Sequence, residues 1–289
     1  MALQPTELEL TDLSAAVKKL WELDDNRLEP GKDYDIDVQA GKQMHSVGDT
    51  AATRLFAKVS DQVWQRKTFL IFYHLLDNYA SATGTAEEVT ACERKETADF
   101  LEAVMDTRPM RYCHALLVAM NLAPADEEGF KRMLHQMWFE LYNRDGSRDS
   151  SGFEHVFVGE HDTSDVAVSG FHNWVTFWIE ERKGALDYRG FLLGRRRQDS
   201  AKVDDADRVL SVQFDWQGQR KPVTTLLVGT SPEFELAMYT LCFVAGAERN
   251  TVVLDDYEVV IRCHRIRSKF GDKVGSCFPE LVRELDLDQ

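Results

Sequence analysis

The sequence predicts an α+β protein with a helical first lobe and a mixed, largely antiparallel second lobe. Apolar residues between positions 50 and 79 recur at close to helical spacing. From Leu210 to Trp216 the period changes to two, because apolar and polar residues alternate. A polar, turn-rich segment over residues 143–151 separates the two patterns. We therefore expect a helical lobe over residues 1–142 and a second lobe over residues 143–289, together forming one domain.

The first lobe contains three stretches with helical patterns. They cover residues 50–79, 97–104 and 130–142, and prolines at positions 109 and 124 interrupt the chain between the last two. No residue in these stretches has an evident chemical role. The first lobe is therefore expected to be a structural support.

The second lobe is expected to contain strands and one capped helix. The strand that ends at Trp216 is followed by a Gln-Gly turn and a returning strand over residues 221–228. Strict alternation along that strand places Lys221, Val223 and Thr225 on one face. A hydroxyl cap, an early proline and a glutamate over residues 230–233 begin a helix that continues to residue 245. Residues 252–264 are expected to form a further strand.

Composition indicates an ordinary globular protein. The chain has 289 residues, of which 44% are hydrophobic and 29% are charged, and no apolar run approaches the roughly 20 residues of a membrane span. Five cysteines without a Cys-x-x-Cys pair indicate free thiols in a reducing compartment. The first residues carry acids and no apolar core segment. We therefore expect an intracellular protein, cytoplasmic or nuclear, without a signal peptide and without membrane contact.

The net charge of −15 argues against a protein that coats nucleic acid, because such proteins present a net basic face. Basic stretches at residues 195–197 and 262–269 still permit contact with a few nucleotides. A cleft that engages a short piece of a polyanion is therefore compatible with the charge.

One triplet occurs twice, each time with a histidine close behind it. Residues 151–155 read Ser-Gly-Phe-Glu-His and residues 169–172 read Ser-Gly-Phe-His. Each Ser-Gly pair is expected to form a turn that aims the following imidazole. Because histidine titrates near neutral pH, His155 and His172 are candidates for an acid–base pair. The alternative is that one or both are structural histidines.

Four segments carry a resemblance to a known family. Residues 151–160 read SGFEHVFVGE, residues 170–174 read GFHNW, residues 221–222 read KP and residues 229–235 read GTSPEFE. They resemble the EndoU (XendoU) endoribonucleases, as do residues 75–79 and 138–142 of the helical lobe. The resemblance covers nearly the whole chain. It implies an enzyme that cuts single-stranded RNA at uridines and leaves 2′,3′-cyclic phosphate and 5′-hydroxyl ends, stimulated by a divalent metal.

The resemblance also implies residue roles. The catalytic set falls on His155, His172 and Lys221, with His172 as the base and His155 as the acid. Such a set suits RNA, whose 2′-hydroxyl needs a base, whose departing 5′ oxygen needs an acid, and whose phosphorane needs a positive charge. Distant relatives place a uridine-reading hydroxyl at the position of Thr225 and a stacking aromatic, usually tyrosine, at that of Phe278.

Several assignments stay open in the sequence. Ser276 joins Thr225 and Phe278 as an expected substrate-binding residue, although Phe278 is also a candidate core aromatic. Glu154 and Glu160 can orient the histidines, bind a divalent cation or remain solvated. The expected cation is Mn²⁺, with Ca²⁺ as the alternative. The expected partner is single-stranded RNA containing uridine, with no obligate protein partner.

Two rival functions remain at this stage. One is a phosphodiesterase that activates water on a metal, since His155, Glu160, His161 and His172 have suitable ligand chemistry. The other is an RNA-binding or interaction protein with the same fold that does not cleave. The presence of all three candidate catalytic residues argues against the second alternative.

Overall fold

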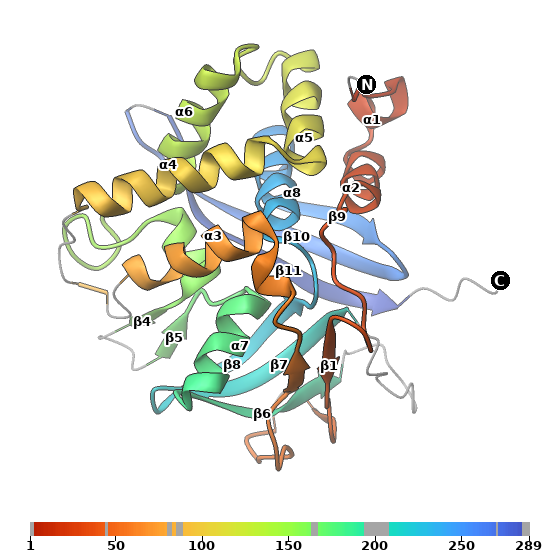
Figure 1. The fold of residues 1–289 in the computed structure, drawn as a ribbon, viewed down its shortest axis with the longest axis vertical. Coiled ribbons are helices and arrows are strands. Elements are labelled where there is room, and N and C mark those ends of the chain that lie inside the picture. The colour runs from red at the N-terminus through yellow and green to blue at the C-terminus, as the bar shows by residue number, and fades with distance from the viewer. Residues whose placement is uncertain are drawn as a thin grey trace.

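The computed structural model describes residues 3–43, 46–79, 83–84, 89–162, 167–193, 208–269 and 271–284. The basic stretch 195–197 lies outside these residues. Within them the chain is α+β, as predicted, with helices of the first lobe in the upper part of the view and strands of the second lobe, together with one helix, in the lower part (Figure 1). Buried side chains from both lobes belong to one hydrophobic core. The boundary between residues 142 and 143 stays a prediction.

The first lobe supplies six helices and two 3₁₀ turns among the described residues. The α-helices are α1 (Glu7–Thr11), α2 (Leu13–Glu22), α3 (Lys67–Leu75), α4 (Ala91–Met105), α5 (Arg108–Ala119) and α6 (Glu127–Trp138). The turns are η1 (Val63–Gln65) and η2 (Leu76–Asn78). The helix predicted over residues 97–104 is confirmed as α4. The helix predicted over residues 130–142 is confirmed only in its first part, because α6 ends at Trp138 and Tyr142 forms a β-bridge with Ser150.

The helix predicted across residues 50–79 is wrong in its first half. Residues Phe56–Val59 form strand β3, which pairs antiparallel with β1 (Tyr34–Ile36). The carboxylate of Glu181 accepts the backbone N–H groups of Leu55 and Phe56 at 2.6 and 3.0 Å, which fixes the chain in an extended form. The helical part of this stretch is α3 with the short 3₁₀ turns η1 and η2 on either side of it. The apolar residues that gave this segment its helical spacing are buried because the strand pairs with a distant strand, and not because they share one face of a helix.

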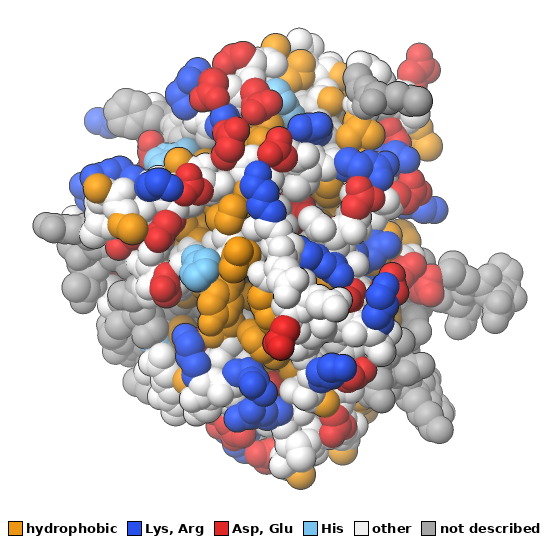
Figure 2. All heavy atoms as spheres, in the orientation of Figure 1, with side chains coloured by type: hydrophobic (Ala, Val, Ile, Leu, Met, Phe, Trp, Pro, Cys, Tyr) orange, Lys and Arg blue, Asp and Glu red, His pale blue; other side chains and the backbone are white. Residues whose placement is uncertain are grey.

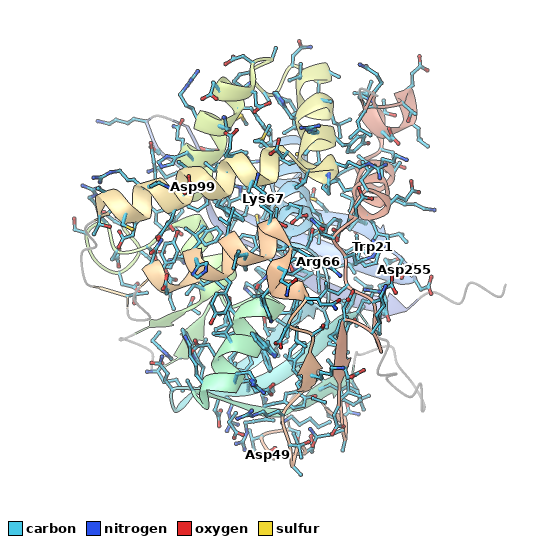
Figure 3. The ribbon with its side chains drawn as sticks, viewed as in Figure 1. Trp21, Asp49, Arg66, Lys67, Asp99 and Asp255 are labelled. Atoms are coloured by element: carbon cyan, nitrogen blue, oxygen red, sulfur yellow. The ribbon has the colours of Figure 1, made fainter. Side chains whose placement is uncertain are left out.

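Arg66 joins the start of α3 to the amino-terminal segment (Figure 3). Its guanidinium pairs with the Asp33 carboxylate at 3.0 Å and donates to the Asn26 carbonyl at 2.8 Å. Asn26 in turn donates to the buried Glu233 carboxylate at 2.6 Å. These contacts tie the first lobe to the start of the last helix.

The second lobe contains two larger sheets and two further helices. Its elements are η3 (Glu154–Val158), β4 (Glu160–Asp162), β5 (Ala167–Ser169), α7 (Trp174–Lys183), β6 (Leu186–Leu193), β7 (Val209–Trp216), β8 (Gln219–Leu227), α8 (Pro232–Ala245), β9 (Arg249–Leu254), β10 (Tyr257–Ile266) and β11 (Lys273–Glu284). One sheet has the order β2-β6-β7-β8, in which β2 is Lys42–Gln43, and the other has the order β11-β10-β9. Strands β4 and β5 pair antiparallel with each other.

Most sequence predictions for this lobe are confirmed. The alternating strand is β7, and the helix after it is α8, where the Ser231 hydroxyl accepts from the Phe234 N–H and Pro232 occupies the first turn. The single strand predicted over residues 252–264 is wrong, because a turn at Asp255 (φ 51°) divides that stretch into β9 and β10. The two form an antiparallel hairpin.

The surface carries both signs of charge. Figure 2 shows acidic and basic side chains interspersed on one face, around an exposed apolar area. That face presents no extended basic surface, in agreement with the net charge. Among the helices that the structure describes, none is long and apolar enough to cross a bilayer.

Candidate active site

The two Ser-Gly-Phe triplets lie against each other. The first begins a helical turn that leads into η3, in which Ser151 accepts from the Glu154 N–H, and the second forms the connection from β5 to α7. The Phe171 N–H donates to the His155 carbonyl at 3.0 Å, and the His172 N–H donates to the Val156 carbonyl at 2.9 Å. The backbone therefore holds the two histidine segments together.

Only the second glycine forms the turn that the sequence predicted. Gly170 has φ 61° and is followed by Phe171 at φ 63°, which is rare for a bulky residue. Gly152 is helical instead, and a Cβ there would approach the Val274 carbonyl to 2.6 Å. The first glycine thus permits close packing on β11, whereas the second permits a left-handed turn.

His155 is backed by a carboxylate. Its Nδ1 lies 2.6 Å from Oε2 of Glu160, and the Arg144 guanidinium lies 3.3 Å from the same oxygen. Burial lowers the pKa of His155, while the hydrogen bond to Glu160 opposes that effect. Burial alone would raise the pKa of Glu160, but His155 and Arg144 together bring it below its usual value. Glu160 therefore stays ionised and favours the imidazolium form of His155.

His172 has a different environment. Its Nδ1 lies 2.8 Å from the Thr224 hydroxyl, and its ring stacks on Phe278 with centroids 4.7 Å apart and planes inclined by 14°. Burial, followed by the charges of Lys221 and His155, lowers the pKa of His172 well below its ordinary value. His172 is therefore neutral near pH 7.

Lys221 completes the group. Its ammonium donates to the Val168 carbonyl at 3.2 Å, and burial lowers its pKa to about 8. At neutral pH most of the Lys221 population still carries its proton. A buried cation near two imidazoles is suited to stabilise a negatively charged ligand.

The expected face of β8 is only partly correct: Lys221 and Val223 both line the pocket described next, whereas Thr225 does not, because the strand is bulged. Pro222 and Val223 together oppose Gln213 of β7, and the Gln213 amide donates to the Pro222 carbonyl at 3.2 Å. Proline has no N–H for the ladder, so an irregularity at this point is expected. After the bulge, Thr224 reaches His172, while Thr225 bonds to the Ser211 hydroxyl at 2.9 Å.

These side chains surround an open pocket of about 500 Å³. The residues that line it come from η3 and the segment before it, from β5 and the turn after it, and from strands β8, β10 and β11. The lining residues are Arg144, His155, Ser169, Gly170, His172, Lys221, Val223, His264, Ile266, Gly275, Ser276 and Phe278.

The structure brings five predicted site residues to this pocket, namely His155, His172, Lys221, Ser276 and Phe278. Phe278 is half-buried and presents part of its ring to the pocket, so it is not a core aromatic. Thr225 is not among the lining residues, and neither are Glu154 and Glu160. Glu160 acts on His155 from behind, and Glu154 is buried in η3.

The metal-ligand set considered from the sequence does not converge. His161 stacks on Trp216 with centroids 4.2 Å apart, and its Nδ1 bonds to the Gln219 side chain at 3.1 Å. Oε2 of Glu160 is occupied by His155 and lies beside the positive charge of Arg144. In the part of the chain that the structure describes, no group of three or more His, Cys, Asp or Glu side chains is placed to hold a metal ion.

Three residues near the pocket were not found from the sequence. Arg144 comes from the polar segment that marked the lobe boundary, and its guanidinium donates to the Gly275 carbonyl at 2.7 Å. His264 stacks on Phe278 with centroids 6.1 Å apart. Thr224 was hidden because strict alternation pointed to Thr225. For Arg144, the only signal in the sequence was the high density of arginine and aspartate around this position.

The arrangement defines an acid–base site for an anionic substrate. One imidazole is held by a carboxylate, a second is neutral, and an ammonium lies beside them in an open pocket with an aromatic wall. Such groups can remove a proton, deliver a proton and stabilise negative charge on one bound molecule.

Comparison with known proteins agrees with this class. The family model for endoribonuclease XendoU matches residues 12–279. The chain is 41% identical to uridylate-specific endoribonuclease B of Danio rerio over 96% of this chain and 98% of that protein. It is 40% identical to poly(U)-specific endoribonuclease-A of Xenopus laevis over 94% of each. The chain belongs to the XendoU endoribonuclease family.

A solved structure supports the same assignment. The structure titled as that of XendoU, a splicing independent snoRNA processing endoribonuclease, superimposes with a TM-score of 0.82. The match has 39% sequence identity and covers 96% of this chain and 98% of that chain. The likeness therefore includes both lobes.

Proposed function

We propose that the protein is a uridylate-specific endoribonuclease that cleaves single-stranded RNA by attack of the 2′-hydroxyl. The main supporting observation is that two histidines in one pocket have different environments: His155 is hydrogen-bonded to a carboxylate, and His172 is neutral. Uridine specificity is taken from the names of the Danio rerio and Xenopus laevis relatives. The proposal rests on this geometry together with membership of the family.

In the proposed reaction His172 acts as the base. It takes the proton of the 2′-hydroxyl, and the 2′ oxygen forms a bond to phosphorus. The bond from phosphorus to the 5′ oxygen then breaks, and protonated His155 gives its proton to that oxygen. The products are a 2′,3′-cyclic phosphate and a 5′-hydroxyl, so atoms and charges balance without added water.

The remaining pocket residues assist this sequence. Glu160 favours the imidazolium of His155 and so opposes the effect of burial, although the pKa of His155 still lies below its ordinary value. Lys221 is placed to stabilise charge on the phosphorane oxygens. Each acid or base is expected to contribute about 10²–10⁴-fold to the rate.

The bound cation that the family suggests does not fit the described residues of this pocket. Arg144 places a positive charge beside Glu160, and no three-ligand group is present among the described side chains. Stimulation by Mn²⁺, or alternatively Ca²⁺, therefore remains a proposal without a role in any step. Adding each ion to the cleavage assay tests it.

The deciding experiment uses an end-labelled oligoribonucleotide with one uridine. We expect cleavage after the uridine, with cyclic phosphate and 5′-hydroxyl ends identified by mass spectrometry. A matched oligonucleotide with 2′-deoxyuridine at that position should resist cleavage, because its nucleophile is missing. Cleavage of both at equal rates would exclude attack by the 2′-hydroxyl and would favour metal-activated water.

Phe278 is expected to stack on the bound base. We expect Phe278→Ala to weaken RNA binding by about 1–3 kcal/mol for every base, since each base has a π-face. It should also lower the cleavage rate, because the ring packs on His172. Binding is measured by fluorescence anisotropy with a non-cleavable 2′-deoxyuridine oligonucleotide.

Phe278→Tyr is the control, because it keeps the ring and is expected to bind normally. If Phe278→Ala leaves binding intact and only lowers the melting temperature, the ring has no role as a platform. We assign reading of the uracil edge to Ser276, which lines the pocket, instead of Thr225, which does not line it and whose hydroxyl is bonded to that of Ser211.

A further inference from the structure

We infer that Thr224 is a positioning residue that holds His172 in the tautomer with its proton on Nδ1. The other ring nitrogen, Nε2, is then unprotonated and can accept a proton. This inference rests on the proposed function only for its catalytic meaning, since the tautomer itself is a property of the folded protein.

The hydrogen-bond directions carry the argument. The Thr224 hydroxyl donates to the Phe171 carbonyl at 2.9 Å, and a carbonyl oxygen can only accept. A hydroxyl has one proton, so Thr224 must use a lone pair toward Nδ1 of His172, 2.8 Å away. The ring therefore donates from Nδ1. In a neutral imidazole this leaves Nε2 as the acceptor.

The Phe171 carbonyl, which accepts the hydrogen bond from Thr224, is held in place by several contacts. Phe171 has a left-handed backbone, its N–H is bonded to the His155 carbonyl, and its ring packs against Phe214 and Trp216 with centroids 4.9 Å from each. The Phe171 carbonyl cannot turn away without breaking these contacts. The unusual φ of Phe171 is thus explained by the direction in which its carbonyl must point.

Burial removes the competition from solvent. Thr224 is 2% exposed and His172 is 6% exposed. Water can therefore not readily replace the hydroxyl as the partner of Nδ1. The β8 bulge is what brings Thr224 to this place, because it shifts the strand after Lys221.

The hydrogen bonds from His172 to Thr224 and from Thr224 to Phe171 are also kept during the proton transfer. When Nε2 takes the 2′ proton, both ring nitrogens carry hydrogen, and Nδ1–H continues to donate to Thr224. The ring does not need to rotate or exchange its partner. Thr224 is not among the residues that line the pocket, so we assign it a role in positioning the base and not a catalytic role.

The first test measures the tautomer directly. In uniformly ¹⁵N-labelled full-length protein, two-dimensional NMR of the imidazole rings distinguishes protonated from bare nitrogen, with His172→Gln used to assign the signals. We expect the wild-type His172 to show a protonated Nδ1 and a bare Nε2 at pH 7. A protonated Nε2 in the wild type would overturn the inference, whatever the protein does to RNA.

The second test compares three substitutions. Thr224→Val removes the hydroxyl at nearly constant side-chain volume, so His172 should become a mixture of both tautomers. We expect kcat to fall by about 10–100-fold, which is part of the contribution of a general base, and KM to change little. Thr224→Ser should restore both the NMR signature and kcat. Thr176→Val is the matched control, because that buried hydroxyl donates to the Phe157 carbonyl at 2.6 Å and contacts no pocket histidine.

The outcomes separate the inference from the proposed function. If Thr224→Val keeps both the wild-type tautomer and the wild-type kcat, Thr224 does not position His172. If Thr176→Val lowers kcat equally, the loss reflects packing, and the inference also fails. If the wild-type protein cleaves no uridine oligonucleotide, the proposed function fails, while the NMR result still decides the tautomer.

Discussion

Replacing His172 or His155 by alanine is expected to lower the rate of RNA cleavage by about 10²–10⁴-fold for each residue. We expect this loss because each imidazole moves one proton in the proposed reaction. Rates are measured under single-turnover conditions with a single-uridine oligonucleotide. His114→Ala serves as a control, since His114 is a half-buried residue of α5 that stacks on Phe130 and does not line the pocket.

An activated leaving group separates the two roles. With p-nitrophenol in place of the 5′ nucleoside, the leaving oxygen needs no acid, so His155→Ala should recover most of its rate. His172→Ala should not recover, because the 2′-hydroxyl still lacks its base. The opposite pattern would reverse the roles of the two histidines. Circular dichroism and melting temperature establish that each variant is folded.

Gly170→Ala is expected to reduce cleavage by about 100-fold or more and to destabilise the fold by about 1–3 kcal/mol. A Cβ at this position would lie 1.8 Å from the His155 carbonyl oxygen and 2.7 Å from its carbonyl carbon, and because the backbone fixes the Cβ, no side-chain rotation relieves the overlap. The positive φ adds strain. Because this turn carries both Phe171 and His172, its displacement should disturb both histidine segments together.

Gly184→Ala provides the matched control. Gly184 has φ +75°, and nothing lies within 4 Å of an added Cβ, so the variant has the backbone strain without the overlap. Denaturant unfolding and the oligonucleotide assay are applied to both variants. Equal stability and equal activity of the two would show that the Gly170 turn can move aside, contrary to the expectation.

Local patterns were sufficient where local interactions decide the structure. The alternation that ends at Trp216 predicted β7, and the Ser231 cap followed by Pro232 predicted α8, because both signals depend on neighbouring residues. They were insufficient for residues 50–66, where apolar spacing suggested a helix. Pairing of β3 with β1 and the distant Glu181 carboxylate determine that segment.

In the candidate site too, some features could be predicted from the sequence and others depend on contacts that form only in the folded chain. The repeated Ser-Gly-Phe motif suggested His155 and His172, and the family resemblance selected these two together with Lys221; the structure places the three at one pocket. The sequence did not indicate that Arg144 would contact Glu160, because the two lie on different segments that only folding brings together.

By itself, the sequence determined the α+β class, the capped helix, the family resemblance and the three candidate catalytic residues. Tertiary structure alone decided which threonine of β8 supports His172. Side-chain alternation is a local property of a strand, but a bulge depends on the partner strand, and the bulge opposite Gln213 sends Thr224 to the histidine and Thr225 to Ser211.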